Sequence, residues 1–533
     1  MPQRVTLATA IAASRRDERL RLLPPSTSPS ASAMISTFLI RGLGFFNDAY
    51  DLFVMNVVNV VLTEQYGYDV YTPAMKSAVS AAALIGAVIG QLVFGVLADR
   101  IGRRVNMIAT CVILIVGGLL CTFASGPNPA ATLWMLVIAR GILGFGIGGE
   151  YPLSASSSAE DATSISSRNR RVALTFSLQG LGCLTAAVMG DVLVRVYASS
   201  ENGMNSPSNL EFVWRALFGV GVLPALIVVY YRFTAKETVT FVNKAAANGD
   251  PTGPLEPPTT LAYMRVVLHH YGGRLLGTAG TWFLFDIVFY AQNLFSASML
   301  SVVGINDASL KEVTRLNVYV ALMALPGYYV AVCFINSLGR KRMQLQGFLF
   351  MAFLFVALGV WWKDIERNST LFVVLFGLAL FFSNFGPNTS TFVLPAEMFP
   401  TAIRASCHGF SAAMGKLGAA IGSYGFSPLV QTSGFGYRGV FLAFAFICLL
   451  ALPLTYFLIF DNTRSLEDMD REFDAILRRA HATAHVDEDE KAQLKPISLH
   501  STCSTSSFDG QELDKFADLE APVRSKGQGV LHI

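Results

Sequence analysis

Long uncharged apolar segments constrain this chain more than any other feature of its sequence. Residues 107–121 and 348–362, for example, contain no charged side chain. A helix needs about 20 mostly apolar residues to cross a bilayer, and no soluble core uses a dozen such segments. Only 14% of the chain is charged, whereas soluble domains average about 25%. The sequence therefore predicts an all-α membrane protein embedded in a lipid bilayer.

The apolar segments divide into two sets of six. We expect spans at residues 35–62, 76–98, 105–125, 131–157, 171–197, 212–232, 275–302, 316–337, 343–362, 370–396, 404–429 and 438–460. A polar stretch containing Pro and Gly separates the sixth from the seventh, which is typical of a linker. The expected parts are a cytoplasmic N-terminal tail (1–33), a six-helix bundle (34–232), a cytoplasmic linker (233–273), a second six-helix bundle (274–460) and a cytoplasmic, largely disordered C-terminal tail (461–533), which begins with a helical pattern.

The basic residues indicate which side is cytoplasmic. Basic clusters follow spans two, four and eight, at residues 100–104, 168–171 and 340–342. Loops rich in Lys and Arg stay in the cytoplasm, and these loops lie on the same side as both tails. The net charge is only +3, too small to predict binding to nucleic acid.

An internal repeat supports the division into two halves. Three features recur at offsets of 237, 237 and 238 positions: the Gly-Arg-basic triplet at 102–104 and 339–341, the pair Glu160 and Glu397, and the pair Asp48 and Asp286. Three agreeing offsets are hard to obtain by chance in unrelated halves. Parallel repeats of this kind place a substrate near the middle of the membrane, at the interface between them.

Residues 95–104 read Gly-Val-Leu-Ala-Asp-Arg-Ile-Gly-Arg-Arg, a pattern that resembles the loop motif of major facilitator transporters. The aspartate can neutralise a neighbouring helix end, and the arginines can pair across the bundle. We interpret these charges as a gate that makes and breaks ion pairs, with ordinary interfacial charge that fixes topology as the alternative. The candidate gating residues are Asp99, Arg100, Arg103, Arg104 and, in span four, Arg140.

Four carboxyl groups fall inside the expected spans: Asp48, Asp51, Glu150 and Asp286. Each costs on the order of several kcal/mol in hydrocarbon unless it is protonated, paired or hydrated. Removal from water favours the neutral form of a carboxyl group, so such groups can exchange protons near neutral pH. All four are candidates for proton coupling, and a structural carboxyl bonded to a neighbouring helix is the alternative for each. Arg140 lies about 15 Å along the helix from Glu150 and is not expected to be its partner.

Span seven places an indole, a carboxyl and a phenol on one face. Trp282, Asp286 and Tyr290 recur every four residues, and side chains at this spacing are neighbours on a helix. Such a stripe is unexpected against lipid and suits the lining of a polar site. Packing alone is the alternative for the two aromatic residues.

Three further polar side chains lie in other spans: Gln179, Asn388 and Lys416. The two amides can hydrogen-bond either a neighbouring helix or a substrate. Lys416 needs an anion, which is either a carboxylate or a bound substrate. Tyr151 directly follows Glu150, next to a proline that can kink the helix there.

Over residues 41–460 the chain resembles the phosphate:proton symporter family of the major facilitator superfamily. The segments that carry the resemblance are residues 44–53, 146–155, 282–295 and 384–418. It implies twelve transmembrane helices in two pseudo-symmetric six-helix bundles. It also implies proton handling by Asp48, Glu150 and Asp286, and a phosphate site made of Tyr151, Gln179, Trp282, Asp286, Tyr290 and Asn388, with Lys416 nearby.

The function expected from this resemblance is proton-coupled import of inorganic phosphate by alternating access at the plasma membrane. No nucleophile with a base, metal-ligand cluster or phosphate-binding Gly-rich loop is evident, so no enzyme, metal or cofactor is expected. Glu150 stands where the family usually has Asp, which leaves open an organic phosphate such as a glycerophosphodiester as the substrate. A nutrient receptor that signals through the Ser-rich stretch 498–507 is another alternative. An acidic dileucine pattern at 18–23 leaves open an endosomal or vacuolar membrane.

Overall fold

The computed structural model describes residues 31–160, 165–199, 205–234, 260–303, 309–462 and 464–493. The dileucine pattern at 18–23, most of the expected linker and the Ser-rich stretch 498–507 lie outside the described residues. The chain separates into two compact units, Met1–His481 and Ala482–Ile533. The first unit contains every long apolar helix of the described ranges.

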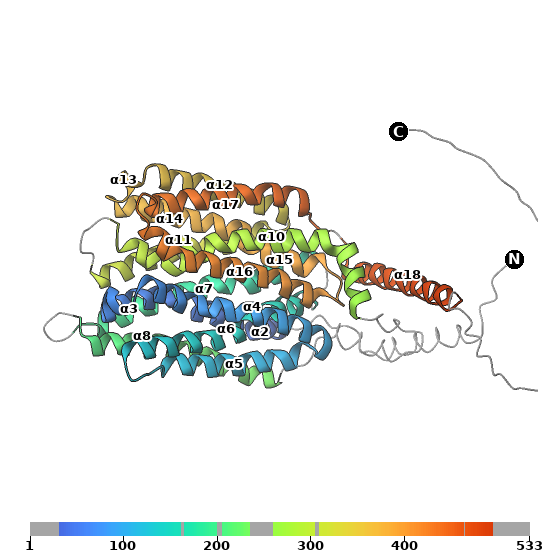
Figure 1. Ribbon diagram of the computed structural model, residues 1–533, viewed down its shortest axis with the longest axis horizontal. Helices are drawn as coiled ribbons and strands as arrows, with labels where there is room; N and C mark the ends of the chain where they lie inside the picture. Colours follow the sequence, from blue (N-terminus) through green and yellow to red (C-terminus); the bar gives the residue numbers. More distant parts are fainter. Residues whose placement is uncertain are drawn as a thin grey trace, which may run out of the picture. The chain divides into compact units, whose positions relative to one another are not determined.

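The described residues fold almost entirely into helices, most of which run side by side (Figure 1). The first group is α2 (Ala31–Phe53), α3 (Met55–Val70), α4 (Pro73–Ile101), α5 (Arg103–Thr122), α6 (Pro129–Glu160), α7 (Ile165–Tyr197) and α8 (Pro207–Thr234). The second group is α10 (Thr260–Leu300), α11 (Leu310–Phe334), α12 (Arg340–Val360), α13 (Trp362–Ile365), α14 (Ser369–Ser383), the π-helical turn η1 (Asn384–Asn388), α15 (Thr389–Met398), α16 (Arg404–Gln431), α17 (Gly436–Leu458) and α18 (Leu466–Gln493).

The long helices match the twelve expected spans. Eleven described segments are long and apolar enough to cross a membrane. The remaining span is α16, which is 28 residues long but carries Arg404, His408 and Lys416. Two spans are interrupted. The first is broken at Val54, where α2 meets α3. The other consists of α14, η1 and α15, and Pro387 of η1 has no backbone N–H to donate to the helix. The prediction of an all-α membrane protein is confirmed.

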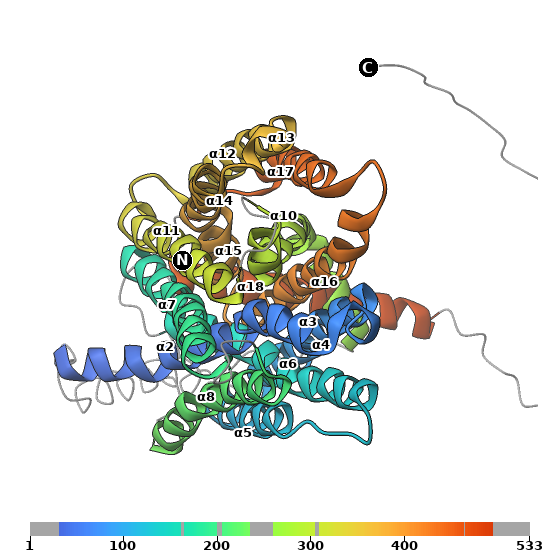
Figure 2. The ribbon, with the colours of Figure 1, turned by 90° about the vertical axis from the view of Figure 1, so that its left-hand side faces the viewer.

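The spans form two groups that meet along a few helices. Viewed along the bundle, α2–α8 and α10–α17 lie on either side of an interface, where α4 packs along α16 and α7 along α11 (Figure 2). The same ion pair recurs in each group: Arg103 lies 2.7 Å from Glu160, and Arg340 lies 2.8 Å from Glu397. The repeat predicted from the sequence is therefore present in the contacts of the folded protein.

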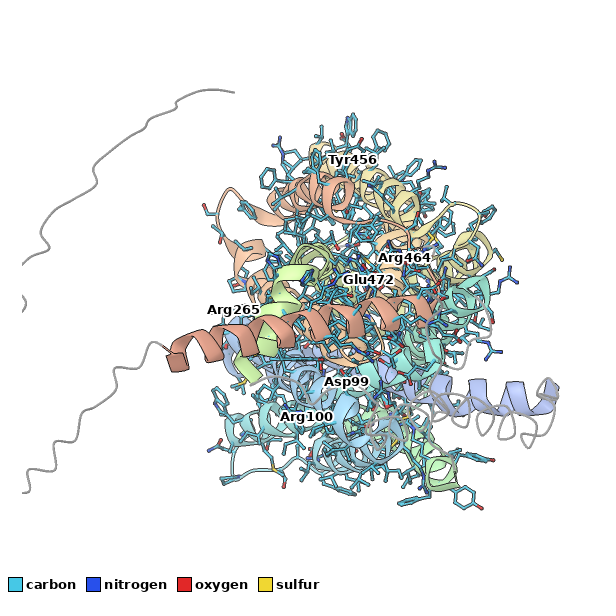
Figure 3. The ribbon with its side chains drawn as sticks, turned by 90° about the vertical axis from the view of Figure 1, so that its right-hand side faces the viewer. Asp99, Arg100, Arg265, Tyr456, Arg464 and Glu472 are labelled. Atoms are coloured by element: carbon cyan, nitrogen blue, oxygen red, sulfur yellow. The ribbon has the colours of Figure 1, made fainter. Side chains whose placement is uncertain are left out.

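The two ends of the bundle differ in their loops. One end, which we call the motif end, carries the tight turns at Gly102 and Gly339, with φ of 107° and 83°. Side chains with a Cβ rarely adopt this conformation, which explains the glycines. Asp99, Arg100 and, on α18, Glu472 also lie at the motif end (Figure 3). The start of α4 and the end of α10 lie at the opposite end.

Glycines allow α4 and α6 to approach closely. A Cβ at Gly144 would collide with the carbonyl oxygen of Ala83, and one at Gly90 would collide with that of Phe145. Helices whose contact positions lack side chains can bring their backbones together. This close contact fixes α6, which carries Tyr151, against the centre of the first bundle.

Two helix boundaries differ from the expected domain limits. α10 begins at Thr260, within the range expected for the linker. α18 begins in the expected C-terminal tail, and its Phe473 packs on Tyr271 of α10 with ring centroids 5.9 Å apart. Asp470 of α18 accepts hydrogen bonds from the backbone N–H and the hydroxyl of Thr401 at 2.6 and 2.7 Å. These parts belong to the folded unit because they cover apolar surface and satisfy backbone groups at the motif end.

We expect Glu160→Gln to destabilise the fold. Glu160 lies 2.7 Å from Arg103 and 3.6 Å from Arg404, and all three side chains are buried. Removing the carboxylate leaves buried guanidinium groups without this partner, a loss of about 3–5 kcal/mol. The thermal midpoint of the purified protein in detergent should fall accordingly. Glu312→Gln, which breaks the exposed pair with Arg315, is the control and should have little effect; equal shifts would contradict the prediction.

Candidate functional site

A buried ion pair between α10 and α16 forms the centre of the candidate site. Lys416 Nζ lies 3.1 Å from Asp286 Oδ2, and each residue is 1% exposed. The Trp282 side chain lies next to Asp286. Charges this far from water are tolerated when they are paired and hydrogen-bonded. Of the two partners that the sequence left open for Lys416, the folded protein contains the carboxylate.

Three aromatic rings surround the Lys416 ammonium group. Its Nζ lies 4.5 Å from the ring centroids of both Tyr151 and Tyr290, and 6.0 Å from that of Trp282. These are cation–π distances, and the two phenol oxygens lie 3.4 Å apart. Tyr151 belongs to the first bundle and the other residues belong to the second. The site is therefore completed only where the two halves meet.

A second polar cluster joins α7, α11 and η1. Asn388 donates hydrogen bonds to the Tyr328 hydroxyl at 3.0 Å and to Asn384 Oδ1 at 2.8 Å. Gln179 of α7 lies next to Tyr328, and its side-chain oxygen is buried without a hydrogen-bond partner among the described residues. The sequence predicted Gln179 and Asn388 but not Tyr328 or Asn384. Tyr328 is 2% exposed whereas its neighbour Tyr329 is 38% exposed, and only the tertiary structure distinguishes these adjacent tyrosines.

Aromatic rings pack across the interface beside the polar clusters. Phe392 of α15 lies 5.0 Å from Phe45, 4.6 Å from Phe176, 6.1 Å from Tyr151 and 6.3 Å from Trp282, measured between ring centroids. Phe45, Phe176 and Tyr151 belong to the first bundle, whereas Phe392 and Trp282 belong to the second. Rings of the two bundles are therefore in direct contact beside the polar clusters.

The carboxyl groups Glu150 and Asp48 differ in their surroundings. Arg232 of α8 forms two hydrogen bonds with Glu150, one of them 2.8 Å from Nη1 to Oε2. Asp48 lies beside this pair and interacts with it electrostatically. Both oxygens of Asp48 are buried and have no hydrogen-bond partner among the described residues. Asp48 can therefore gain or lose a proton without breaking an ion pair.

Sequence reasoning did not find Arg232. It lies in the last turn of the sixth span, and arginines at the ends of spans usually lie at the membrane surface. No spacing or motif connects it with Glu150, because the two residues lie on different helices 82 positions apart. Their contact becomes visible only when α6 and α8 pack together.

Asp51 and Arg140 form a separate group in the first bundle. Asn47 donates to Asp51 Oδ2 at 3.0 Å, and Arg140 Nη1 donates to the backbone carbonyl of Asp51 at 2.8 Å. Arg140 and Glu160 are about 30 Å apart along α6. Arg140 therefore lies apart from the candidate gating residues at the motif end. As expected, it is not the partner of Glu150, which is hydrogen-bonded by Arg232.

Charged residues of the loop motif connect the two halves at the motif end. Asp99 accepts hydrogen bonds from the backbone N–H and the hydroxyl of Ser406, each at 2.8 Å. Arg103 lies 3.3 Å from Asp99 and 2.7 Å from Glu160, and Glu160 lies 3.6 Å from Arg404. Because Ser406 and Arg404 belong to the second bundle, this network closes the motif end.

The other two arginines of the motif lie on the surface. Arg104 is exposed and donates to the carbonyl oxygen of Phe233 at 2.7 Å. Arg100 is exposed next to Asp99 (Figure 3). Both side chains therefore lie outside the buried part of the network.

Amide and hydroxyl groups form a closing layer at the opposite end, made of Asn56, Asn59, Leu294, Ser296 and Asn317. Asn56 donates to Ser296 Oγ at 2.6 Å and to Asn317 Oδ1 at 2.9 Å. Asn59 donates to the carbonyl oxygen of Leu294 at 3.2 Å. The donors belong to the first bundle and the acceptors to the second. With contacts between the halves at both ends and aromatic rings between them, the described structure is an occluded state.

Two cavities lie between the site and the opposite end. The smaller has a volume of about 40 Å³ and is lined by Tyr328 and Asn384 of the second polar cluster and by Asn56 of the closing layer. It has room for about three water molecules. The larger has a volume of about 360 Å³ and lies among the ends of α3, α4, α10, α11, α16 and α17. This volume falls within the range of about 300–1,000 Å³ that is typical of small-molecule pockets.

The arrangement of the site suits an anion whose binding is linked to a proton. An ammonium group, phenols, an indole and amides can donate hydrogen bonds, and one carboxylate can accept them. Within the described ranges, no group of three or more His, Cys, Asp or Glu could hold a metal ion.

Comparison with known proteins agrees with this architecture. The family model described as "Sugar (and other) transporter" matches residues 37–249 and 275–473. The chain is 34% identical over 487 residues to a probable inorganic phosphate transporter 1-6 of Arabidopsis thaliana, covering 82% of this chain and 93% of the relative. It is 35% identical to inorganic phosphate transporter 1-2 of Oryza sativa subsp. japonica, covering 81% and 93%. The chain belongs to the inorganic phosphate transporter family of the major facilitator superfamily.

Solved structures of more distant proteins share the fold of this transporter. The proton:xylose symporter XylE bound to 6-bromo-6-deoxy-D-glucose matches with a TM-score of 0.65 at 20% identity, covering 83% of this transporter and 99% of XylE. A partially occluded inward open conformation of XylE from E. coli matches with a TM-score of 0.64 at 19% identity. The predicted family and the predicted fold of two six-helix bundles are confirmed. The roles of individual site residues remain predictions.

We expect Asp286→Asn and Lys416→Met each to destabilise the transporter. Each change leaves the other member of the pair charged, buried and without this partner, at a cost of about 3–5 kcal/mol. The double variant removes both charges and should recover much of the lost stability. Thermal midpoints in detergent measure this cycle, with Arg471→Gln, which breaks an exposed pair with Glu467, as the control. A double variant no more stable than either single variant would rule out the pairing.

Proposed function

We propose that this protein imports inorganic phosphate together with protons by alternating access. The observation that carries the proposal is the buried Asp286–Lys416 pair, enclosed by aromatic rings from both halves. Two relatives are named inorganic phosphate transporters, and a proton:xylose symporter shares the fold, which supports both the substrate and the coupling. In this architecture, substrates bind near the middle of the membrane between the repeats.

Phosphate binding exchanges the partners of the ion pair. Dihydrogen phosphate keeps P–OH donors near neutral pH, and Asp286 accepts one of them while Lys416 turns to a phosphate oxygen. Sulfate offers no such donor, so the Asp286 carboxylate repels it. The remaining donors to phosphate in this proposal are Tyr151, Gln179, Trp282, Tyr290 and Asn388.

Asp48 is the proton carrier that we favour among the candidate carboxyl groups. Its oxygens have no hydrogen-bond partner among the described residues, whereas Glu150 is held by Arg232. Loss of the Asp48 proton places a second negative charge beside Glu150 and favours a state in which water reaches this region. Asp51, which accepts a hydrogen bond from Asn47, is the secondary candidate.

Opening on either side breaks one set of contacts between the halves. At the motif end these are the Asp99–Ser406 and Glu160–Arg404 contacts, and at the opposite end they centre on Asn56. We place the motif end in the cytoplasm because its loops are rich in Arg and Lys. Phosphate then arrives from the opposite end of the bundle, and the membrane that we propose is the plasma membrane.

The Glu150–Arg232 contact favours inorganic phosphate over an organic phosphate. The longer acid at position 150 forms two hydrogen bonds with Arg232, so an ion pair within the bundle accounts for it without a different substrate. Glycerophosphodiesters are therefore competitors to test and not the expected substrate.

Proteoliposomes that contain the purified protein should accumulate radiolabelled phosphate when their lumen is alkaline relative to the outside. A protonophore that collapses the pH gradient should stop accumulation, and excess sulfate or glycerophosphodiester should not compete. Asp286→Asn should abolish accumulation, because the acceptor for P–OH is lost. Asp364→Asn, an exposed carboxylate on α13, is the control. Accumulation that survives either the collapse or Asp286→Asn would refute the proposal.

We expect Asp48→Asn to uncouple the transporter without unfolding it. One pH unit supports about a tenfold phosphate ratio for each coupled proton, and the Asn variant should approach a ratio of one. Exchange of internal for external phosphate at equal pH should continue in this variant. Glu150→Gln should instead lower the thermal midpoint, because it leaves Arg232 without its carboxylate. An Asp48→Asn variant that accumulates phosphate as well as the unmodified protein would exclude Asp48 as the carrier.

A further inference from the structure

The larger cavity contains a lysine that the transport site does not use. Lys76 of α4 lines it together with Ser298 and Ser301 of α10 and Ser427 of α16. Lys76 Nζ donates to Ser298 Oγ at 2.8 Å and lies 5.9 Å from the centroid of the Phe295 ring. Among the described residues Lys76 has no carboxylate as an ion-pair partner. The cavity therefore combines a positive charge with several hydroxyl donors.

The acidic residue on the lining does not neutralise this charge. Glu64 is exposed at the end of α3, and its Oε1 accepts a hydrogen bond from Asn205 at 3.1 Å. Tyr71, another lining residue, donates its hydroxyl to Asn59 at 2.7 Å. Lys76 is the only lysine or arginine among the lining residues of the described cavity.

The cavity lies in line with the transport site along α10. Ser298 is eight residues from Tyr290 and twelve from Asp286, or about 12 and 18 Å by helical rise. The bonds from Asn56 to Ser296 and from Asn59 to Leu294 fall between these levels. When this closing layer opens, an anion in the cavity has a short path to the Asp286–Lys416 pair.

We propose that this cavity is a loading site for phosphate, in which Lys76 holds the anion before the closing layer opens toward the transport site. This inference rests on the proposed function, because it requires phosphate to arrive from the opposite end. An ammonium group that forms no ion pair with a carboxylate of the described residues raises the local concentration of an anion in a cleft of low dielectric constant. The hydroxyls of Ser298 and Ser427 donate to the remaining phosphate oxygens, and the hydroxyl of Ser301, which donates to the backbone carbonyl of Ser298 at 2.9 Å, turns to them when phosphate binds.

Loading and opening are coupled in this arrangement. The Lys76–Ser298 hydrogen bond joins the first bundle to the second. A phosphate that engages the ammonium group competes with Ser298 for it and so removes one of the contacts that keep the opposite end closed. A ligand that binds the more open arrangement better shifts the population toward it.

The test is uptake of radiolabelled inorganic phosphate by proteoliposomes at a fixed pH gradient. Lys76→Gln should raise the KM on the order of 3- to 10-fold and change the maximal rate much less, because it removes the charge that concentrates the substrate. High ionic strength should slow uptake at low phosphate in the unmodified protein more than in this variant. Lys363→Gln removes an exposed lysine of α13 at the same end, is the matched control and should keep the KM.

Two further variants distinguish a loading site from a hydrogen bond that only holds the two halves together. Ser298→Ala removes the hydrogen bond between the halves but keeps the ammonium group, and it should raise the KM less than Lys76→Gln does. Lys76→Cys should behave like Lys76→Gln and recover a low KM after reaction with 2-aminoethyl methanethiosulfonate, which restores the charge. Methyl methanethiosulfonate, which adds no charge, should not rescue it, and the unmodified protein treated with each reagent controls for the native cysteines.

The outcomes are distinct. Active uptake with an unchanged KM in Lys76→Gln would overturn the loading site and leave the proposed function in place. Equal effects of Ser298→Ala and Lys76→Gln, or rescue by the uncharged reagent, would show that Lys76 only holds the two halves together. Either result would overturn the loading site. Absence of phosphate uptake by the unmodified protein would remove the proposed function and the loading site with it.

Discussion

Charge buried within an apolar bundle must find a partner inside the protein, and this constraint organises the structure. An ionised side chain far from water is costly unless a second charge or hydrogen bonds compensate it. Lys416 therefore pairs with Asp286, Arg232 with Glu150, and Arg103 with Glu160. Each pair joins different helices, so the positions of the charges and the packing of the helices determine one another.

The same few helices carry the site and both closures. α6 holds Tyr151 at the site and Glu160 at the motif end, whereas α10 holds Asp286 at the site and Ser296 in the closing layer. A helix that moves as a rigid element transmits a change at one level to the other levels. The contacts between the halves at both ends include hydrogen bonds and ion pairs, which water can replace when an end opens. This combination suits two bundles that rock about a fixed central site.

Local patterns identified much of the candidate site before any helix was packed. The four-residue spacing placed Trp282, Asp286 and Tyr290 on one face, and all three are buried in the folded protein. Tyr328 and Arg232 were missed for different reasons. Tyr328 stands beside a second tyrosine in an apolar span, so no period selects one of the two. Arg232 lies at a helix end, where arginine is common at membrane surfaces and gives no sign of a buried partner.

The sequence by itself determined the number of spans, the division into two halves and the repeat, because these depend on hydrophobic length and on residues at fixed offsets along one chain. It also placed Asp48, Asp51, Glu150 and Asp286 inside the spans, where a carboxyl group is costly unless it is protonated, paired or hydrated. Only the tertiary structure decided the partners: Asp286 for Lys416, Arg232 for Glu150, and Ser298 for Lys76. Partners come from helices far apart in sequence, and their identity depends on how the helices rotate and approach one another, which no local pattern records.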